Sequence, residues 1–168
     1  MQVKNLIDTF FRSQHNIDRI LYDPQDVDLD PNDDSQNIRK VFEIMKKDPM
    51  GGSLIYDKCA DGAGHYNDCP WYVIEVTASD IRKAIVQIKS TLKYIYGKGD
   101  RVRNIAILLD ENRWNDRLAR SIYKIERDLL FKRRKTNNES ITISHNGETL
   151  IFDINCYLVD FEKYGGVI

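Results

Sequence analysis

One stretch of this chain constrains its fold more than any other: residues 71–95, where an apolar run passes directly into a helical pattern. The run Trp71-Tyr-Val-Ile-Glu-Val-Thr77 has the length and the β-branched content of a buried strand. The residues after it place apolar side chains at helical spacing, at Ile81, Ala84, Ile85, Ile88, Leu92 and Ile95. A strand followed by such a helix predicts an α/β arrangement in which the helix covers a sheet.

Glu75 is the one charged residue of this strand. Burying a carboxylate costs free energy unless a partner or a metal compensates for the lost hydration. Glu75 is therefore either a functional residue in the interior or a solvent-facing residue of an edge strand. The sequence leaves both interpretations open, and it makes Glu75 the first candidate for a site.

Length and composition indicate one soluble domain with an ordinary core. The chain has 168 residues, of which 42% are hydrophobic and 30% charged. No apolar run is long enough to span a membrane, so we expect a cytoplasmic protein with no membrane partner. Within the single domain we expect an N-terminal helix and acidic loop (1–35), a core (36–130) and a C-terminal hairpin extension (131–168).

The net charge of −1 hides a strong asymmetry. Residues 81–136 contain 16 Lys and Arg against 6 Asp and Glu, a net charge of +10. A concentrated positive segment in a neutral chain favours an anionic partner such as nucleic acid. A solvated basic face without a partner is the alternative.

Hydrophobic spacing predicts further elements on both sides of residues 71–95. We expect helices over 2–20 and 36–47, the second carrying Glu43, and a strand over 53–57 that ends at Asp57. The run 102–110 is continuously apolar near its centre, as in a central strand. These elements predict a mixed sheet flanked by helices.

A long helix is expected from 112 to 130, with one apolar and one basic face. The basic face and the segment after it carry the predicted nucleic-acid-binding residues, which are Arg113, Arg117, Arg120, Lys124, Arg127, Arg133 and Arg134. A row of cations without interspersed Glu exceeds what solvation of a helix face requires.

Two alternating runs within 140–154 are joined through Asn146-Gly147, which predicts a hairpin with a type I′ turn. In the loop before residue 70, Cys59, His65 and Cys69 are spaced Cys-x5-His-x3-Cys. Structural zinc sites use four ligands and closer cysteine pairs, so we interpret these three as incidental loop residues.

Asp57 ends one predicted strand and Glu75 lies near the end of its neighbour, and carboxylates in that arrangement bind hard cations such as Mg²⁺ or Mn²⁺. Asp57 and Glu75 are separated by 17 residues, Glu75 lies in the run Ile74-Glu75-Val76-Thr77, and Gln87 follows on a helix. This pattern resembles the PD-(D/E)xK nuclease superfamily, which includes restriction endonucleases and Holliday-junction resolvases. The resemblance implies a restriction-endonuclease-like core. It also implies Asp57 and Glu75 as metal ligands, with Gln87 and Glu43 in support. Asp61 and Asp68 are alternatives to Asp57.

Thr77 stands where that superfamily has its lysine. Lys83 lies one turn before Gln87 on nearly the same helix face, so it is the expected substitute. Thr77 also fits a helix-capping role with Asp80.

The resulting hypothesis is a metal-dependent endonuclease-like protein that acts on or binds DNA, in preference to RNA. The alternative is a non-catalytic module on the same fold that binds nucleic acid or protein. A homodimer or another protein partner is left open.

Overall fold

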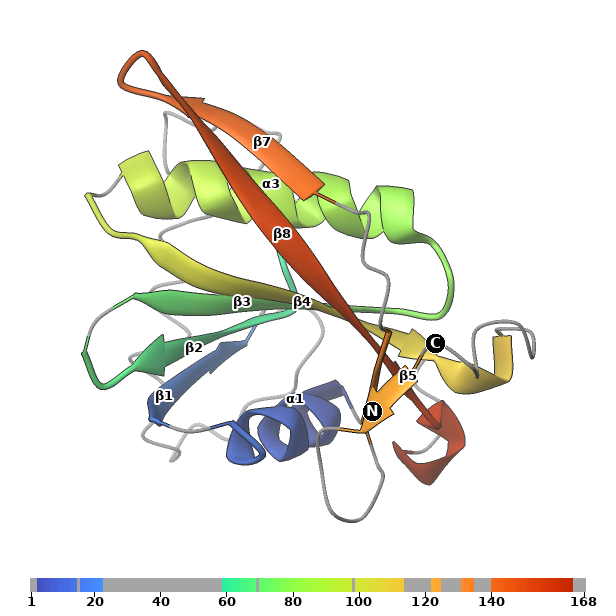
Figure 1. Ribbon diagram of the computed structural model, residues 1–168. Coiled ribbons are helices and arrows are strands. Elements are labelled where there is room, and N and C mark those ends of the chain that lie inside the picture. The colour runs from blue at the N-terminus through green and yellow to red at the C-terminus, as the bar shows by residue number, and fades with distance from the viewer. Residues whose placement is uncertain are drawn as a thin grey trace.

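The computed structural model describes residues 3–14, 16–22, 59–68, 70–97, 99–113, 122–124, 131–134 and 140–164. In chain order its elements are α1 (Val3–Arg12), β1 (Ile17–Tyr22), β2 (Gly62–Tyr66), β3 (Trp71–Thr77), α3 (Ile81–Gly97), β4 (Val102–Asp110), η2 (Glu111–Arg113), β5 (Ile122–Lys124), β6 (Lys132–Arg134), β7 (Ser140–His145), β8 (Glu148–Val159) and η3 (Phe161–Tyr164). The sheet follows the order β1-β2-β3-β4-β8-β6-β5, and β7 pairs with β8 beside this path (Figure 1).

The sheet is mixed, as the sequence predicts. β1, β2 and β3 form an antiparallel meander, whereas β3, β4 and β8 run parallel to one another. Parallel neighbours need a crossover connection, and α3 supplies it between β3 and β4. The bounds of β3 and β4 coincide with the predicted runs 71–77 and 102–110, and α3 occupies the predicted helix.

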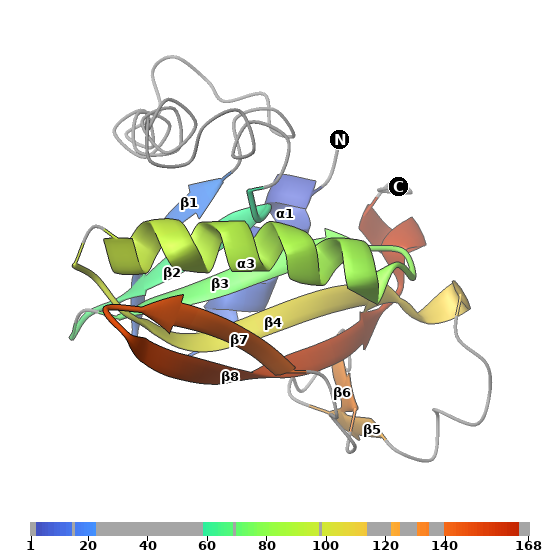
Figure 2. The same ribbon diagram turned by 90° about the horizontal axis from the view of Figure 1, so that it is seen from above.

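A separate apolar core lies on each face of the sheet. The core on the α3 side includes Val73, Ile88 and Ile107, all fully buried. The core on the α1 side centres on Phe10, whose ring meets four other aromatic rings at centroid distances of 5.0–5.7 Å. Figures 1 and 2 show α3 on one face and α1 on the other. Central strands are therefore covered on both sides, which explains why they are continuously apolar.

The predicted hairpin is confirmed, and its second strand is longer than expected. Asn146 and Gly147 have φ values of 51° and 78°, the positive values that a type I′ turn requires. The first half of β8 pairs with β7, and its second half, Ile154–Val159, pairs with β4. Residues 131–168 therefore supply β6 and half of β8 to the main sheet as well as the hairpin. In the α3-side core, Ile141 and Ile143 of β7 pack near α3.

The first helix is shorter than the predicted range 2–20. α1 ends at Arg12, Asn16 has a φ of 67°, and the chain continues as β1 from Ile17. The left-handed residue redirects the chain, and pairing with β2 then satisfies the backbone of β1. Ile17 and Ile20, which fit the helical spacing, lie instead on a strand.

The expectation of one helix over 112–130 is wrong. Residues 111–113 form a short 3-10 turn, and Ile122–Lys124 is strand β5, which pairs with β6. β6 in turn pairs with β8, and the adjacent Phe131 is fully buried 5.2 Å from the Phe10 ring. Pairing at the sheet edge and burial of Phe131 thus override the local helical pattern. The predicted helix 36–47 and strand 53–57 lie outside the described residues.

Gly64 tests the packing between β2 and α1. A Cβ atom at residue 64 would lie 2.9 Å from Cε1 of Phe11, and neighbouring rings at 5.5–5.7 Å surround that buried ring. We expect Gly64→Ala to lower the free energy of unfolding by about 1–3 kcal/mol, measured by urea denaturation.

Gly97→Ala is the matched control, because a Cβ there meets nothing within 4 Å and Gly97 ends a helix. That change should leave stability unchanged or raise it slightly. Equal stability of the two variants would contradict the close packing of β2 on Phe11.

Candidate functional site

Glu75 lies inside the protein. β3 runs between β2 and β4, so the alternative of an edge strand with Glu75 facing water is wrong. Alternation along β3 places Glu75 on the same face as Trp71 and Val73, which belong to the α3-side core. The residue is 3% exposed. A buried carboxylate on a central strand marks this place as the candidate site.

Asp61 accompanies Glu75 in the interior, 7% exposed and just before β2. The backbone N–H of Asp61 donates to Oε2 of Glu75 at 3.0 Å. The backbone N–H of Val76 donates to Oδ2 of Asp61 at 2.7 Å. The ladder between β2 and β3 begins at Gly62 and Ile74, so these bonds continue it through side chains. Each carboxylate is thereby fixed by a backbone N–H group from the segment that carries the other.

Thr91 of α3 fastens the segment before β2 to the helix. Its hydroxyl accepts a hydrogen bond from the backbone N–H of Ala60 at 2.8 Å and donates to the carbonyl of Gln87 at 3.3 Å. Thr91 is 1% exposed and lies among apolar side chains. The hydrophobic pattern of the helix did not reveal this role, because a single Thr inside an apolar stripe resembles an ordinary core residue. The bond places Asp61, the next residue, beside α3.

The other acids proposed from the sequence lie elsewhere. Asp57 and Glu43 fall outside the described residues. Asp68 is exposed in the turn between β2 and β3 and pairs with Arg103 at 2.8 Å. The hydrogen bond from Arg103 lowers the pKa of Asp68, so this carboxylate serves a surface ion pair. Of the two candidate Asp residues that the structure describes, Asp61 and not Asp68 is bonded to Glu75.

The helix residues of the predicted site lie along α3. Gln87 is half-buried one turn before Thr91, and Lys83 is exposed one turn earlier. Thr77 ends β3, and the capping expected of it belongs to Asp80, whose Oδ1 accepts from the backbone N–H of Lys83 at 3.0 Å. Lys83 and Gln87 thus share one side of the helix, and Thr77 is not needed to start it.

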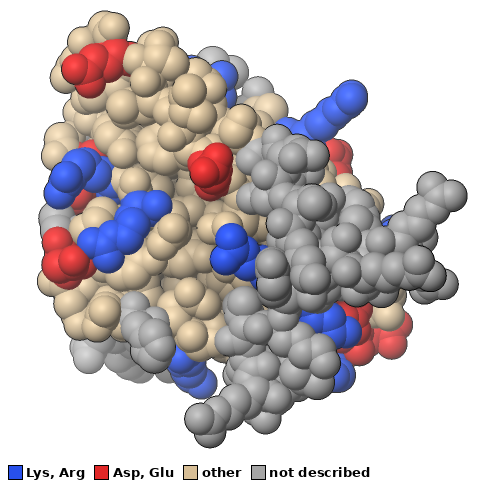
Figure 3. Space-filling view, in the orientation of Figure 1, with Lys and Arg blue, Asp and Glu red and all other residues tan. Residues whose placement is uncertain are grey.

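The cations predicted along 112–130 do not lie on one helix, because Ile122–Lys124 forms strand β5. Arg113 is exposed in η2, and Arg133 is exposed on β6. Lys124 and Arg134 lie on β5 and β6. The other members, Arg117, Arg120 and Arg127, lie outside the described residues. On the face shown in Figure 3, the described Lys and Arg side chains are interspersed with Asp and Glu.

The described members of the loop set, Cys59 and His65, make separate contacts. Cys59 is buried in the α3-side core, whereas His65 on β2 lies 3.2 Å from Asp18 and packs edge-on against Trp71. Cys69 lies outside the described residues. No group of three or more His, Cys, Asp or Glu residues suited to a metal occurs in the part of the chain that the structure describes.

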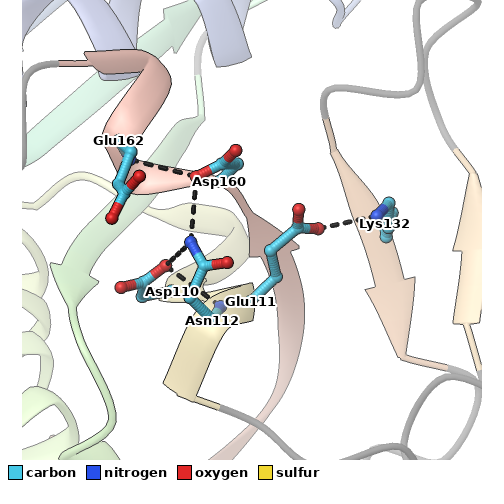
Figure 4. Close-up of polar contacts among 6 residues, drawn as sticks. All are labelled: Asp110, Glu111, Asn112, Lys132, Asp160 and Glu162. Carbon is cyan, nitrogen blue, oxygen red and sulfur yellow. Dashed lines mark hydrogen bonds and ion pairs between the residues drawn. The ribbon is translucent and has the colours of Figure 1, made fainter.

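A second polar cluster lies where β4 and β8 end (Figure 4). The side-chain amide of Asn112 donates to Asp110 at 3.1 Å and to Asp160 at 2.9 Å. Glu111 beside it pairs with Lys132 at 2.7 Å. These groups satisfy one another and tie the end of β4 to the segments after β8 and at β6. We assign this cluster a structural role.

No protein-family model, curated protein or solved structure matches the chain. Among the helices described, none is long and apolar enough to cross a membrane.

Thr91→Val tests the connection between α3 and Asp61. The change keeps the side-chain shape but removes the acceptor of the buried Ala60 N–H, which should cost about 1–3 kcal/mol of unfolding free energy. Hydrogen exchange at the amide of Ala60 should accelerate by more than the loss of global stability explains. Thr91→Ser, which keeps the hydroxyl, should preserve the slow exchange. Unchanged exchange in Thr91→Val would show that the bond does not hold this segment.

Proposed function

We propose that this protein is a metal-dependent, nuclease-like protein that acts on DNA, with Asp61 and Glu75 as its acidic centre. The observation that carries the proposal is the pair of buried carboxylates linked by hydrogen bonds of 3.0 and 2.7 Å to each other's backbone segments. Carboxylates fixed on neighbouring strands are the ligands that hard divalent cations take in phosphate-cleaving sites.

The proposal keeps the resemblance to PD-(D/E)xK nucleases and revises one residue. Asp61, just before β2, takes the place that the sequence favoured for Asp57. A three-stranded meander followed by a helix and a parallel strand brings Asp61, Glu75 and the side of α3 that carries Gln87 into one region. This arrangement supports a restriction-endonuclease-like core around the site.

The described residues fit Mg²⁺ or Mn²⁺ better than a softer metal. They offer two carboxylates and no third Asp, Glu, His or Cys within reach. Magnesium commonly takes one or two carboxylates and completes its shell with water and substrate phosphate. Asp61 and Glu75 would hold the ion. When bound, such an ion neutralises phosphate charge and favours ionisation of water.

The chain's own residues would supply orientation and charge. The backbone N–H groups of Asp61 and Val76 fix the carboxylates that bind. Gln87 has a neutral amide that can position water or phosphate, and the exposed Lys83 is the cation on the same side of α3. Lys83 would orient the water for attack on phosphorus, the role that the resemblance assigns to the missing lysine at 77.

A second function rests on Thr77. This half-buried side chain carries no charge at the position where the superfamily has a lysine. If Lys83 does not replace it, the same fold would serve as a non-catalytic module that binds nucleic acid. Both functions predict that the protein binds nucleic acid, and the nuclease alone predicts that it cleaves it.

Glu75→Gln tests the nuclease. The amide oxygen can still accept the Asp61 N–H, but the negative charge that holds the ion is lost. We expect Mg²⁺- or Mn²⁺-dependent cleavage of duplex, junction or single-stranded DNA to fall at least about 100-fold. Calorimetry should show Mn²⁺ binding to the wild type and a loss of that binding in the variant.

Glu148→Gln is the control, because Glu148 is an exposed carboxylate beside the hairpin turn. It should leave both readouts unchanged. Asp57→Asn and Glu43→Gln, tested alongside, examine the ligands first expected from the sequence. A wild-type protein that binds DNA but cleaves none of the three substrates with either metal would refute the nuclease and leave the binding module.

A further inference from the structure

The outward face of α3 carries cations and no acid. The helix of 17 residues contains four Lys and Arg and no Asp or Glu. Its buried side consists of Ala84, Ile88, Thr91, Leu92 and Ile95, whereas its four cations, Arg82, Lys83, Lys89 and Lys93, are all exposed. Exposed helix faces usually mix cations with Glu, because such pairs stabilise the helix and keep the surface neutral. α3 departs from that pattern in the direction of a positive surface.

Three of these cations form a straight row. Residues 82, 86, 89 and 93 are separated by steps of four, three and four, so at 100° per residue they lie within about 60° of one another. Arg82 and Lys93 are then about 16 Å apart along the helix axis, at 1.5 Å per residue. Val86 lies between them with 46% of its surface exposed. We call Arg82, Lys89 and Lys93 the α3 basic row.

The basic row makes no ion pair with any described residue. The described ion pairs join other partners, namely Lys4 with Asp8, His65 with Asp18, Arg103 with Asp68, and Lys132 with Glu111. The nearest acid along the chain, Asp80, accepts a backbone bond at the start of α3. The amino end of the helix adds positive potential there. Among the described residues, no ion pair therefore neutralises a cation of the row.

We propose that the α3 basic row binds the phosphate backbone of nucleic acid. A row of exposed cations on a helix that contains no Asp or Glu suits a polyanion such as a phosphate backbone, and contacts of this kind carry most of the non-specific affinity for DNA. The inference rests on the proposed function for its choice of polyanion. It places the phosphate contact on α3, whereas the sequence alone predicted that contact along residues 112–130.

Other partners fit this face less well. A helix that lies on a membrane buries its apolar face in lipid, but the apolar face of α3 is buried against the sheet, and Val86 alone among its large apolar residues is strongly exposed. A protein interface is centred on a cluster of apolar or aromatic side chains, whereas the exposed positions of α3 offer Val86 alone among four cations. Nucleic acid needs neither feature.

The position of the row connects binding with the acidic centre. Residues 78–80 join the end of β3 directly to the first turn of α3, where Arg82 lies. Glu75 is two residues before the end of β3. A nucleic-acid backbone bound along the row from Lys93 to Arg82 would therefore reach the end of β3 near which Glu75 lies.

The test uses the full chain with Arg82, Lys89 and Lys93 all changed to Glu. Binding of fluorescent duplex and single-stranded DNA is followed by anisotropy over a series of salt concentrations. We expect affinity at low salt to fall at least about 30-fold, and the slope of log K against log salt to become shallower by about 3, one for each lost phosphate contact. Circular dichroism and the melting temperature should match the wild type, because all three residues are exposed.

A matched variant carries Arg12→Glu, Arg101→Glu and Lys163→Glu, which change net charge equally at exposed sites on other elements. It should keep nearly all of the affinity and the salt slope. Equal loss in both variants, no binding of DNA by the wild type at 50 mM salt, or preference for anionic phosphatidylserine vesicles over DNA would each overturn the proposal.

Glu75→Gln separates this proposal from the nuclease. With the basic row intact, that variant should bind DNA as the wild type does while failing to cleave it. Wild-type binding without cleavage would refute the nuclease and leave the α3 surface standing. Cleavage and binding that both survive reversal of the row would refute the surface and leave the nuclease.

Discussion

The parallel pairing of β3 with β4 is the constraint from which the rest of the arrangement follows. Two parallel neighbours cannot be joined by a tight turn, so the chain must cross one face of the sheet between them. α3 makes that crossing and covers Val73 and Ile107 on the way. Its path places one side of the helix against the interior, where Glu75 lies, and leaves the opposite side in solvent.

This division explains how one helix serves both proposed roles. Its inner side carries Thr91, whose hydroxyl fastens Ala60 and so positions Asp61 beside the helix. Its outer side carries cations that make no described ion pair. A nuclease needs acids held rigidly in the interior and cations free to follow phosphates at the surface. In the proposed function the two faces of α3 would meet these opposite requirements, because the sheet buries one of them and not the other.

The polar groups of the interior show why the acids are held firmly. The pairing of β2 with β3 stops at Gly62 and Ile74, and the side chains of Asp61 and Glu75 continue it by accepting backbone N–H groups. Each carboxylate thereby satisfies a donor that would otherwise be buried without a partner. Structural and chemical roles coincide in these two residues, so a variant such as Glu75→Gln, which keeps an acceptor, can separate charge from packing.

Some of this architecture could be predicted from local sequence, because local patterns suffice where one segment carries its own signal. The apolar run 71–77, the helical spacing after it, the run 102–110 and the Asn146-Gly147 turn each determined their element. The short strands β1 and β6 could not be predicted, since each pairs with a strand distant in sequence, β2 and β8, and β5 then pairs with β6 at the sheet edge.

The acidic centre, Asp61 with Glu75, was likewise predictable from the sequence only in part. Glu75 was identifiable from the sequence, because a single charge in an apolar strand is costly wherever that strand is buried. Which aspartate joins it was decided by tertiary structure. Asp61 contacts Glu75 because the register of β2 against β3 brings Gly62 opposite Ile74, whereas Asp68 lies in the turn at the other end of the same pair. Sequence determined that a charge would be buried, and strand register, which depends on contacts across the sheet, decided its partner.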